Sequence, residues 1–62
     1  MKILFPNDNV LEVNENSKVI DAAFALSEGL ARNTVAGEVN GELVDLSYVL
    51  KEGDNVKFIT MK

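Results

Sequence analysis

The fold is decided by the stretch Val35-Ala36-Gly37-Glu38-Val39-Asn40-Gly41-Glu42-Leu43-Val44-Asp45-Leu46, in which two apolar runs meet at the dipeptide Asn40-Gly41. Asparagine and glycine tolerate the positive φ angles that a two-residue type I′ turn needs, and this turn matches the twist of the strands that it joins. The stretch therefore predicts a β-hairpin with its turn at Asn40-Gly41. Because a tight turn requires these residues, a structural role explains them better than a recognition loop does.

Two further strands are expected near the amino terminus. Ile3-Leu4-Phe5 is a short β-type run, and the turn residues Pro6-Asn7-Asp8-Asn9 stop it. The next run, Val10 to Asn14, alternates in polarity, with Leu11 and Val13 on one face. We expect these two runs to pair as a hairpin.

A helix is predicted to follow, starting near Lys18 with Ser17 as its N-cap and Asp21 favouring the helix dipole. Apolar residues recur there at helical spacing and predict one buried face, made of Val19, Ile20, Ala23, Phe24, Leu26 and Leu30. Gly29 is expected to end this helix in a left-handed conformation, which leaves residues 30–33 as a turn.

After the central hairpin, Asp45 is expected to cap one short helical turn that presents Leu46, Val49 and Leu50. The segment Lys51-Glu52-Gly53-Asp54 predicts a turn. The last run, Val56 to Met61, is rich in β-branched and aromatic residues and is expected in the centre of the sheet.

The resulting order is β-β-α-β-β-turn-β, which predicts an α+β chain of the β-grasp (ubiquitin-like) class. Such a fold has a mixed sheet of about five strands, with the last strand parallel to the first and one helix packed on one face of the sheet.

Composition limits the function. The chain has 62 residues, enough for a single domain, and contains neither cysteine nor histidine. The common zinc ligand sets and the usual base of a nucleophile triad are therefore missing, and catalysis by this chain alone is not expected. The net charge is −4, with the six cations scattered as Lys2, Lys18, Arg32, Lys51, Lys57 and Lys62. This balance argues against strong autonomous binding to DNA or RNA.

The amino-terminal apolar run is too short for a signal peptide, and no stretch approaches membrane-spanning length. We therefore expect a cytoplasmic chain without a membrane partner.

Several ordered motifs resemble the TGS domain, a small module of threonyl-tRNA synthetases, certain GTPases and stringent-response ppGpp enzymes. Phe5-Pro6-Asn7-Asp8 resembles the opening strand and turn of that family, although Asn9 stands where the family usually has glycine. Ser17-Lys18-Val19-Ile20-Asp21-Ala22-Ala23 resembles its capped helix start, and the stretch around Asn40-Gly41 resembles its signature. The similarity extends over nearly the whole chain.

Within the family, Gly29-Leu30-Ala31-Arg32 followed by the central stretch looks most like the threonyl-tRNA synthetase branch. The ppGpp synthetase/hydrolase branch carries an isoleucine-histidine-threonine element where this chain has Ala25-Leu26-Ser27, so a regulatory module of that branch ranks second, and a GTPase module third. Ubiquitin-like sulfur carriers end in Gly-Gly, whereas this sequence ends Ile59-Thr60-Met61-Lys62.

The resemblance implies a single domain over residues 1–62, cut from the amino terminus of a threonine--tRNA ligase. It implies a non-catalytic module that positions the adjacent editing domain or the tRNA, with no cofactor of its own. ATP, magnesium and zinc would be used in other domains of the parent, and the partners would be those neighbouring domains and, weakly, tRNA.

Two groups of residues are candidates for contacts. Arg32 and Asn40 are candidates for RNA contact, although a lone arginine after a helix more often caps carbonyls or stays solvated. If Val56 and Phe58 face the core, an outward docking face would follow, made of Leu4, Lys57, Ile59 and Met61. Scattered exposed apolar residues are also normal on any protein surface. Glu38 and Glu42 flank the turn without a pocket and are expected only to solubilise the hairpin.

Overall fold

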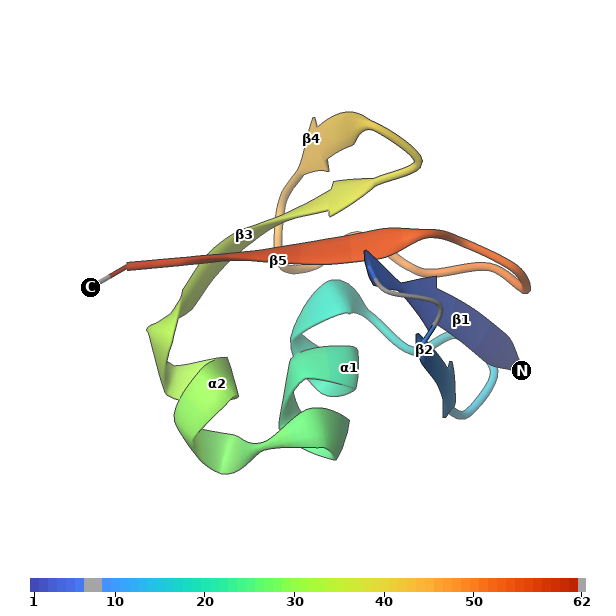
Figure 1. The fold of residues 1–62 in the computed structure, drawn as a ribbon, viewed down its shortest axis with the longest axis horizontal. Helices are drawn as coiled ribbons and strands as arrows, with labels where there is room; N and C mark the ends of the chain where they lie inside the picture. Colours follow the sequence, from blue (N-terminus) through green and yellow to red (C-terminus); the bar gives the residue numbers. More distant parts are fainter. Residues whose placement is uncertain (7–8, 62) are drawn as a thin grey trace.

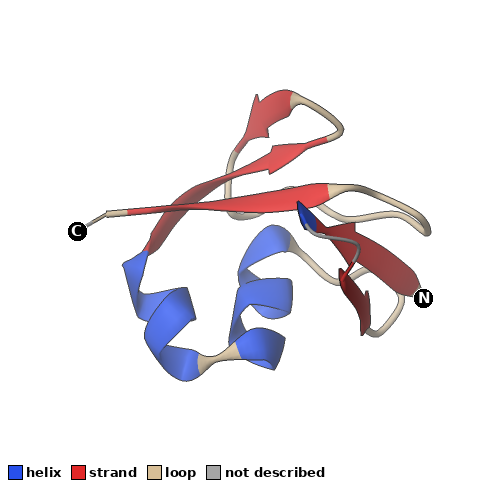
Figure 2. Ribbon diagram, in the orientation of Figure 1, coloured by secondary structure: helices blue, strands red, loops and turns tan. Residues whose placement is uncertain are grey.

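The computed structural model describes residues 1–6 and 9–61 and has the β-grasp architecture. Its elements in chain order are β1 (Lys2–Phe5), β2 (Asn9–Glu12), α1 (Val19–Leu26), α2 (Glu28–Asn33), β3 (Thr34–Val39), β4 (Glu42–Val44) and β5 (Val56–Thr60). The helices lie together on one side of β3 and β5, as Figures 1 and 2 show. The α+β class is therefore confirmed, with two helices in place of the single one expected.

The five strands form two sheets and not one. β1 pairs antiparallel with β2, and β4, β3 and β5 form an antiparallel sheet in that order. The two sheets meet at a single parallel bridge between Leu4 and Asn55. The position expected for the last strand is therefore wrong, because β3 is the central strand of its sheet and β5 lies at the edge.

The reason lies in the segment that precedes β5. The backbone N–H of Gly53 donates to the carbonyl of Lys2 at 2.7 Å, and the N–H of Leu4 donates to the carbonyl of Asp54 at 2.8 Å. The backbone groups of β1 thus form hydrogen bonds with loop residues and not with β5 itself. The expected parallel relationship of first and last strands holds at this junction, and Gly53 (φ 80°) allows the turn that leads into it.

The central hairpin forms as the sequence predicts. β3 and β4 pair with Val39 opposite Glu42, and the two residues between them form the turn. Asn40 has φ 53° and Gly41 has φ 89°, so both central positions have the positive φ of a type I′ turn. The first hairpin, β1 with β2, is confirmed as well. The side chain of Asn9 donates to the carbonyl of Pro6 at 3.1 Å, whereas the turn predicted at Asn7 and Asp8 lies outside the described residues.

The predicted cap of the first helix is wrong. Lys18 occupies the N-cap position of α1, and its backbone N–H donates to Oδ2 of Asp21 at 2.9 Å. The hydroxyl of Ser17 instead donates to the carbonyl of Asn14 at 2.7 Å. Ser17 therefore closes the turn before the helix, and Asp21 satisfies the first exposed donor, as a carboxylate in a first helical turn can.

The helical region breaks at Ser27, two residues before the glycine that was expected to end it. Ser27 is extended (φ −169°, ψ 136°), and its Oγ accepts from the N–H of Leu30 at 3.3 Å, which caps α2. Gly29 lies inside α2, and residues 30–33, expected as a turn, are helical. The change of direction leaves Phe24 55% and Leu26 45% exposed, so the single buried stripe expected from the sequence is only partly correct.

The core gathers side chains from both sheets and from α1. Its buried members are Ile3, Val13, Val19, Ala22, Val39, Leu50 and Val56. Leu50 comes from the connection between β4 and β5, where Leu46 and Ser47 form a turn, as the sequence predicts. The carboxylate of Asp45 caps this turn by accepting from the N–H of Ser47 at 3.1 Å and from its hydroxyl at 2.6 Å.

In the described part of the chain, neither helix has the length or the apolar character needed to cross a membrane.

Candidate functional site

Both residues singled out for RNA contact are engaged within the chain. Arg32 lies in the last turn of α2, and one of its guanidinium nitrogens is 2.6 Å from Oε2 of Glu28. Asn40 uses its side chain twice: Nδ2 donates to Oδ1 of Asp54 at 3.0 Å, and Oδ1 accepts from the N–H of Asn55 at 2.9 Å. The Asn40 bonds therefore connect the hairpin turn to the segment before β5.

These two residues do not share a surface. Arg32 precedes β3 and Asn40 follows it, so they lie at opposite ends of that strand (Figure 1). A strand of this length spans about 20 Å at roughly 3.3 Å per residue. The structure thus provides two separate polar positions and not one phosphate-binding cluster.

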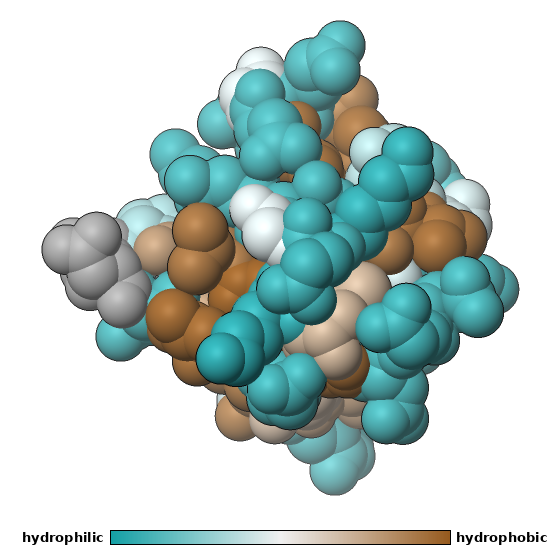
Figure 3. All heavy atoms as spheres, turned by 90° about the vertical axis from the view of Figure 1, so that its right-hand side faces the viewer, coloured by the Kyte–Doolittle hydropathy of each residue, from teal (hydrophilic) through white to brown (hydrophobic). Residues whose placement is uncertain are grey.

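The four residues of the expected docking face differ in their exposure to solvent. Lys57, Met61 and Leu4 are exposed, Leu4 to 37%, whereas Ile59 is half-buried and paired with Ala36 of β3. Val56 is buried and Phe58 half-buried, in agreement with their expected inward direction. The view from the β1 side shows brown apolar patches separated by hydrophilic side chains (Figure 3). The charge of Lys57 likewise separates Leu4, beside Asn55, from Ile59 and Met61.

A wider apolar hollow lies between the β1–β2 hairpin, the helices and β5. We call it the helix groove. Its volume is about 590 Å³, and its lining residues are Phe5, Pro6, Asn9, Val10, Leu26, Leu30, Val56, Lys57, Phe58 and Thr60. The rings of Phe5 and Phe58 form part of its wall, with centroids 5.5 Å apart. Apolar surface gathered in a concave site is typical of binding grooves.

Reasoning from sequence missed the helix groove because it placed Leu26 and Leu30 on one continuous helix face, packed in the core. The break at Ser27 turns them toward an open hollow instead. A signal was present: Ser27 stands three residues before Leu30, the spacing at which a serine N-cap accepts from a backbone N–H.

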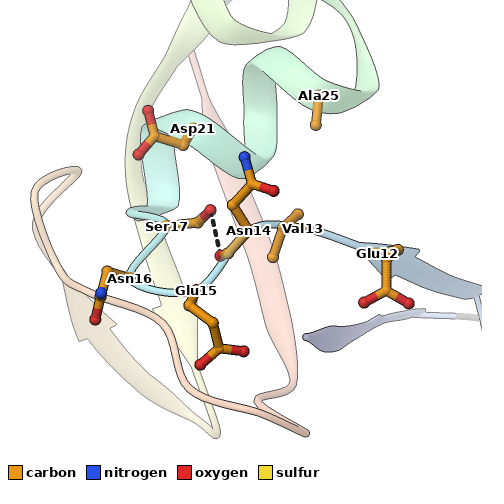
Figure 4. A pocket seen from close by; sticks show the side chains of 8 residues that line it. All are labelled: Glu12, Val13, Asn14, Glu15, Asn16, Ser17, Asp21 and Ala25. Atoms are coloured by element: carbon orange, nitrogen blue, oxygen red, sulfur yellow. Dashed lines mark hydrogen bonds between the residues drawn. The ribbon is translucent and has the colours of Figure 1, made fainter.

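A second hollow, drawn in Figure 4, lies where β2 leads into α1 and is lined with carboxylates. The carboxylate of Glu12 is 2.8 Å from the amino-terminal nitrogen of Met1, and that of Glu15 is 3.7 Å away. The hydrogen bond between Met1 and Glu12 raises the pKa of the amine and lowers the pKa of the Glu12 carboxyl. Asp21, as described above, caps α1. The acidic side chains of this hollow thus have partners within the fold.

Within residues 1–6 and 9–61, no group of three or more His, Cys, Asp or Glu side chains is arranged to hold a metal ion.

Element order and sheet pairing define a small β-grasp module with the helix groove on one side. A model of the TGS domain matches residues 1–60, and the chain belongs to the TGS domain family. Relatives include the threonine--tRNA ligase of Petrotoga mobilis, 38% identical over 61 residues, or 98% of this chain and 10% of that protein. The corresponding ligases of Desulforamulus reducens and Acetivibrio thermocellus are 40% and 42% identical over 60 residues, in each case 97% of this chain and 9% of that protein. The chain thus spans about a tenth of the length of the curated relatives it matches.

Proposed function

We propose that this chain is the amino-terminal, non-catalytic TGS module of a threonine--tRNA ligase, a single domain over residues 1–62, and that it positions a neighbouring domain of that enzyme. The observation that carries the proposal is the match to threonine--tRNA ligases along nearly the entire chain, at only about a tenth of their length. Aminoacylation, with its ATP and metal ions, then belongs to the remainder of the enzyme, in the cytoplasm.

Contact with protein, and not with tRNA, is the mode of action that the surface favours. The net charge is −4, and the two candidate RNA contacts are separated and bonded within the fold. Phosphate recognition generally relies on several cations on one face. The helix groove offers instead apolar side chains from three parts of the fold, as docking surfaces do.

The position of the helix groove also supports docking of a neighbouring protein domain. Thr60, the last residue of β5, lines it, and the N–H of Met61 donates to the carbonyl of Asn33 at 2.8 Å, which holds this end of the chain beside α2. In a longer parent, the residues after Met61 would begin next to the groove. A following domain would therefore be close enough to occupy it.

A chimeric enzyme tests this proposal. The matching segment of the Acetivibrio thermocellus ligase is replaced by this chain, and threonylation of tRNA and hydrolysis of mischarged tRNA are measured. Val10, 57% exposed, lines the groove, whereas Leu43, 71% exposed, lies in β4 away from it. We expect Val10→Glu to reduce one of the two activities several-fold and Leu43→Glu to leave both unchanged. Equal effects of the two substitutions would contradict docking through the groove.

Direct RNA contact is tested separately by titrating the 62-residue chain with threonine tRNA at low salt while recording amide chemical shifts. We expect no localised shifts. Shifts confined to the surroundings of Arg32 and Asn40 would instead favour recognition of the tRNA by this module.

A further inference from the structure

The side chain of Asn40 is held by bonds to residues far along the chain. Its carboxamide donates to Asp54 and accepts from Asn55, and its backbone N–H donates to the carbonyl of Asn55 at 2.8 Å. Oδ2 of Asp54 also accepts from the N–H of Lys51 at 2.8 Å. The carboxamide of Asn40 is therefore one part of a connected polar cluster, which joins the hairpin turn to the loop before β5.

The next residue, Gly41, is open to solvent. A β-carbon built on it would meet no atom within 4 Å. Because glycine has no side chain, its backbone nitrogen can approach the carboxamide carbon of the preceding asparagine with little hindrance. We propose that Asn40-Gly41 is a site of spontaneous deamidation, and that the bonds from Asn40 to Asp54 and Asn55 slow this reaction in the folded chain.

The reaction needs only water as co-reactant. The backbone nitrogen of Gly41 attacks Cγ of Asn40 and loses its proton, and a nitrogen–carbon bond closes a five-membered imide. The bond between Cγ and Nδ2 breaks, and Nδ2 leaves as ammonia. Water then opens the imide at one of its two carbonyls, which gives aspartate or isoaspartate at position 40. The attack requires the carboxamide to turn away from Asp54 and Asn55, so both hydrogen bonds must open first.

The product is incompatible with the cluster. A carboxylate at position 40 lacks the N–H that Asp54 accepts and brings a second negative charge toward the Asp54 carboxylate. Isoaspartate additionally lengthens the backbone of a two-residue turn by one carbon, which disturbs the pairing of β3 with β4. Deamidation is therefore expected to loosen the hairpin from the loop before β5.

The first experiment uses the unsubstituted chain, incubated at mildly alkaline pH in native buffer and in denaturant. Intact mass follows the loss of ammonia, and peptide mapping locates isoaspartate. We expect deamidation at Asn40 in denaturant and a rate at least about tenfold lower in native buffer, because an opening free energy of about 1.4 kcal/mol already gives that factor. Equal rates in the two conditions, or no reaction in denaturant, would overturn the proposal.

A variant pair assigns the protection to the hydrogen bonds. Asp54→Ala removes the acceptor of Nδ2, and Val13→Ala removes packing elsewhere in the core. At matched stability, we expect Asp54→Ala to deamidate several-fold faster than Val13→Ala in native buffer. If the two variants react at the same rate, the bonds to Asp54 do not protect Asn40. Should Asp54→Ala not fold, the comparison of native and denatured unsubstituted chain still decides whether folding protects the site.

Discussion

Gly37 in β3 lies against Val19 of α1 so closely that a β-carbon built on Gly37 would be 2.7 Å from Cγ1 of Val19. Real β-carbons essentially never approach another heavy atom this closely. The helix therefore rests on the sheet at the one residue of β3 that has no side chain.

This contact predicts that Gly37→Ala destabilises the fold. Overpacking of a close contact typically costs about 1–3 kcal/mol, and urea unfolding measures it. Gly29→Ala is the matched control, because a β-carbon there would meet only Oγ of Ser27 at 3.6 Å and alanine favours α2. We expect the control to be neutral or stabilising. Val19→Ala should partly relieve Gly37→Ala, and strict additivity of the two changes would argue against the contact.

The helix break predicts unequal effects for two serines. Ser27→Ala removes the acceptor of the Leu30 N–H, and the loss of an N-cap typically costs about 0.5–2 kcal/mol. Hydrogen exchange should accelerate at the first amides of α2. Ser17→Ala removes the bond to the carbonyl of Asn14 and should leave exchange in α2 unchanged. Faster exchange in α2 from Ser17→Ala would mean that the two helices are not capped separately.

Stability should fall at both ends of the pH range. The folded pKa of the Met1 amine lies above its ordinary value of 8.0, because the amine donates to Glu12. The contribution of the protonated amine to the stability of the fold is complete below pH 8.0 and is lost as pH rises through the raised pKa. The pKa of Glu12 lies below 4.5 through the same hydrogen bond, and that of Asp45 lies below 3.8 through bonds from Ser47. Their contributions are present above these ordinary values and are lost as pH falls through the lowered ones.

Thermal unfolding across pH measures both losses. In a plot of unfolding temperature against pH, Glu12→Gln should reduce the fall at alkaline pH and also the fall at acid pH. Asp45→Asn should reduce only the fall at acid pH. Glu42→Gln, on the exposed strand β4, serves as the control. A fall at alkaline pH that persists in Glu12→Gln would show that the Met1 amine is stabilised by other groups.

The docking face expected from the sequence leads to a prediction for Ile59. This side chain is half-buried, and the stem of a lysine can cover the same surface while its charge reaches water. We expect Ile59→Lys to leave the isolated chain folded and to perturb its seating in the chimeric enzyme. Val56→Lys, at a buried position of the same strand, should abolish the fold. Loss of the amide spectrum in Ile59→Lys would mean that the inward and outward faces of β5 were assigned wrongly.

Sequence reasoning succeeded where the chemistry of a residue allows few conformations. Asn40-Gly41 could be assigned because a two-residue turn needs positive φ at both positions, and both have it. It failed where two signals competed. Ser27 and Gly29 are both able to end a helix, and the local sequence does not decide between them. In the structure the break lies at Ser27, where α2 begins and packs against α1.

The hairpin of β1 with β2 was predicted correctly, but the contact of β1 on its other side was beyond prediction from local pattern. On that side, β1 lies beside the segment around Asp54. This segment is a turn, as the sequence indicates, but its backbone N–H and carbonyl groups form hydrogen bonds with β1 as those of a strand would. These two wrong predictions concealed the helix groove. Its walls come together only because the chain changes direction between α1 and α2 and because β5 is the edge strand of its sheet. Its apolar residues were visible in the sequence, but their common orientation was not.

The junction of β1 with the start of β5 has a mechanical consequence. Both strands run in the same direction there, so the two ends of the described chain leave on opposite sides of the molecule (Figure 1). Tension applied through those ends would pull β1 and β5 past each other in shear. The bonds from Gly53 to Lys2 and from Leu4 to Asp54 would carry the load together, instead of opening one after the other. A pull on the two ends is therefore resisted by several backbone hydrogen bonds at once.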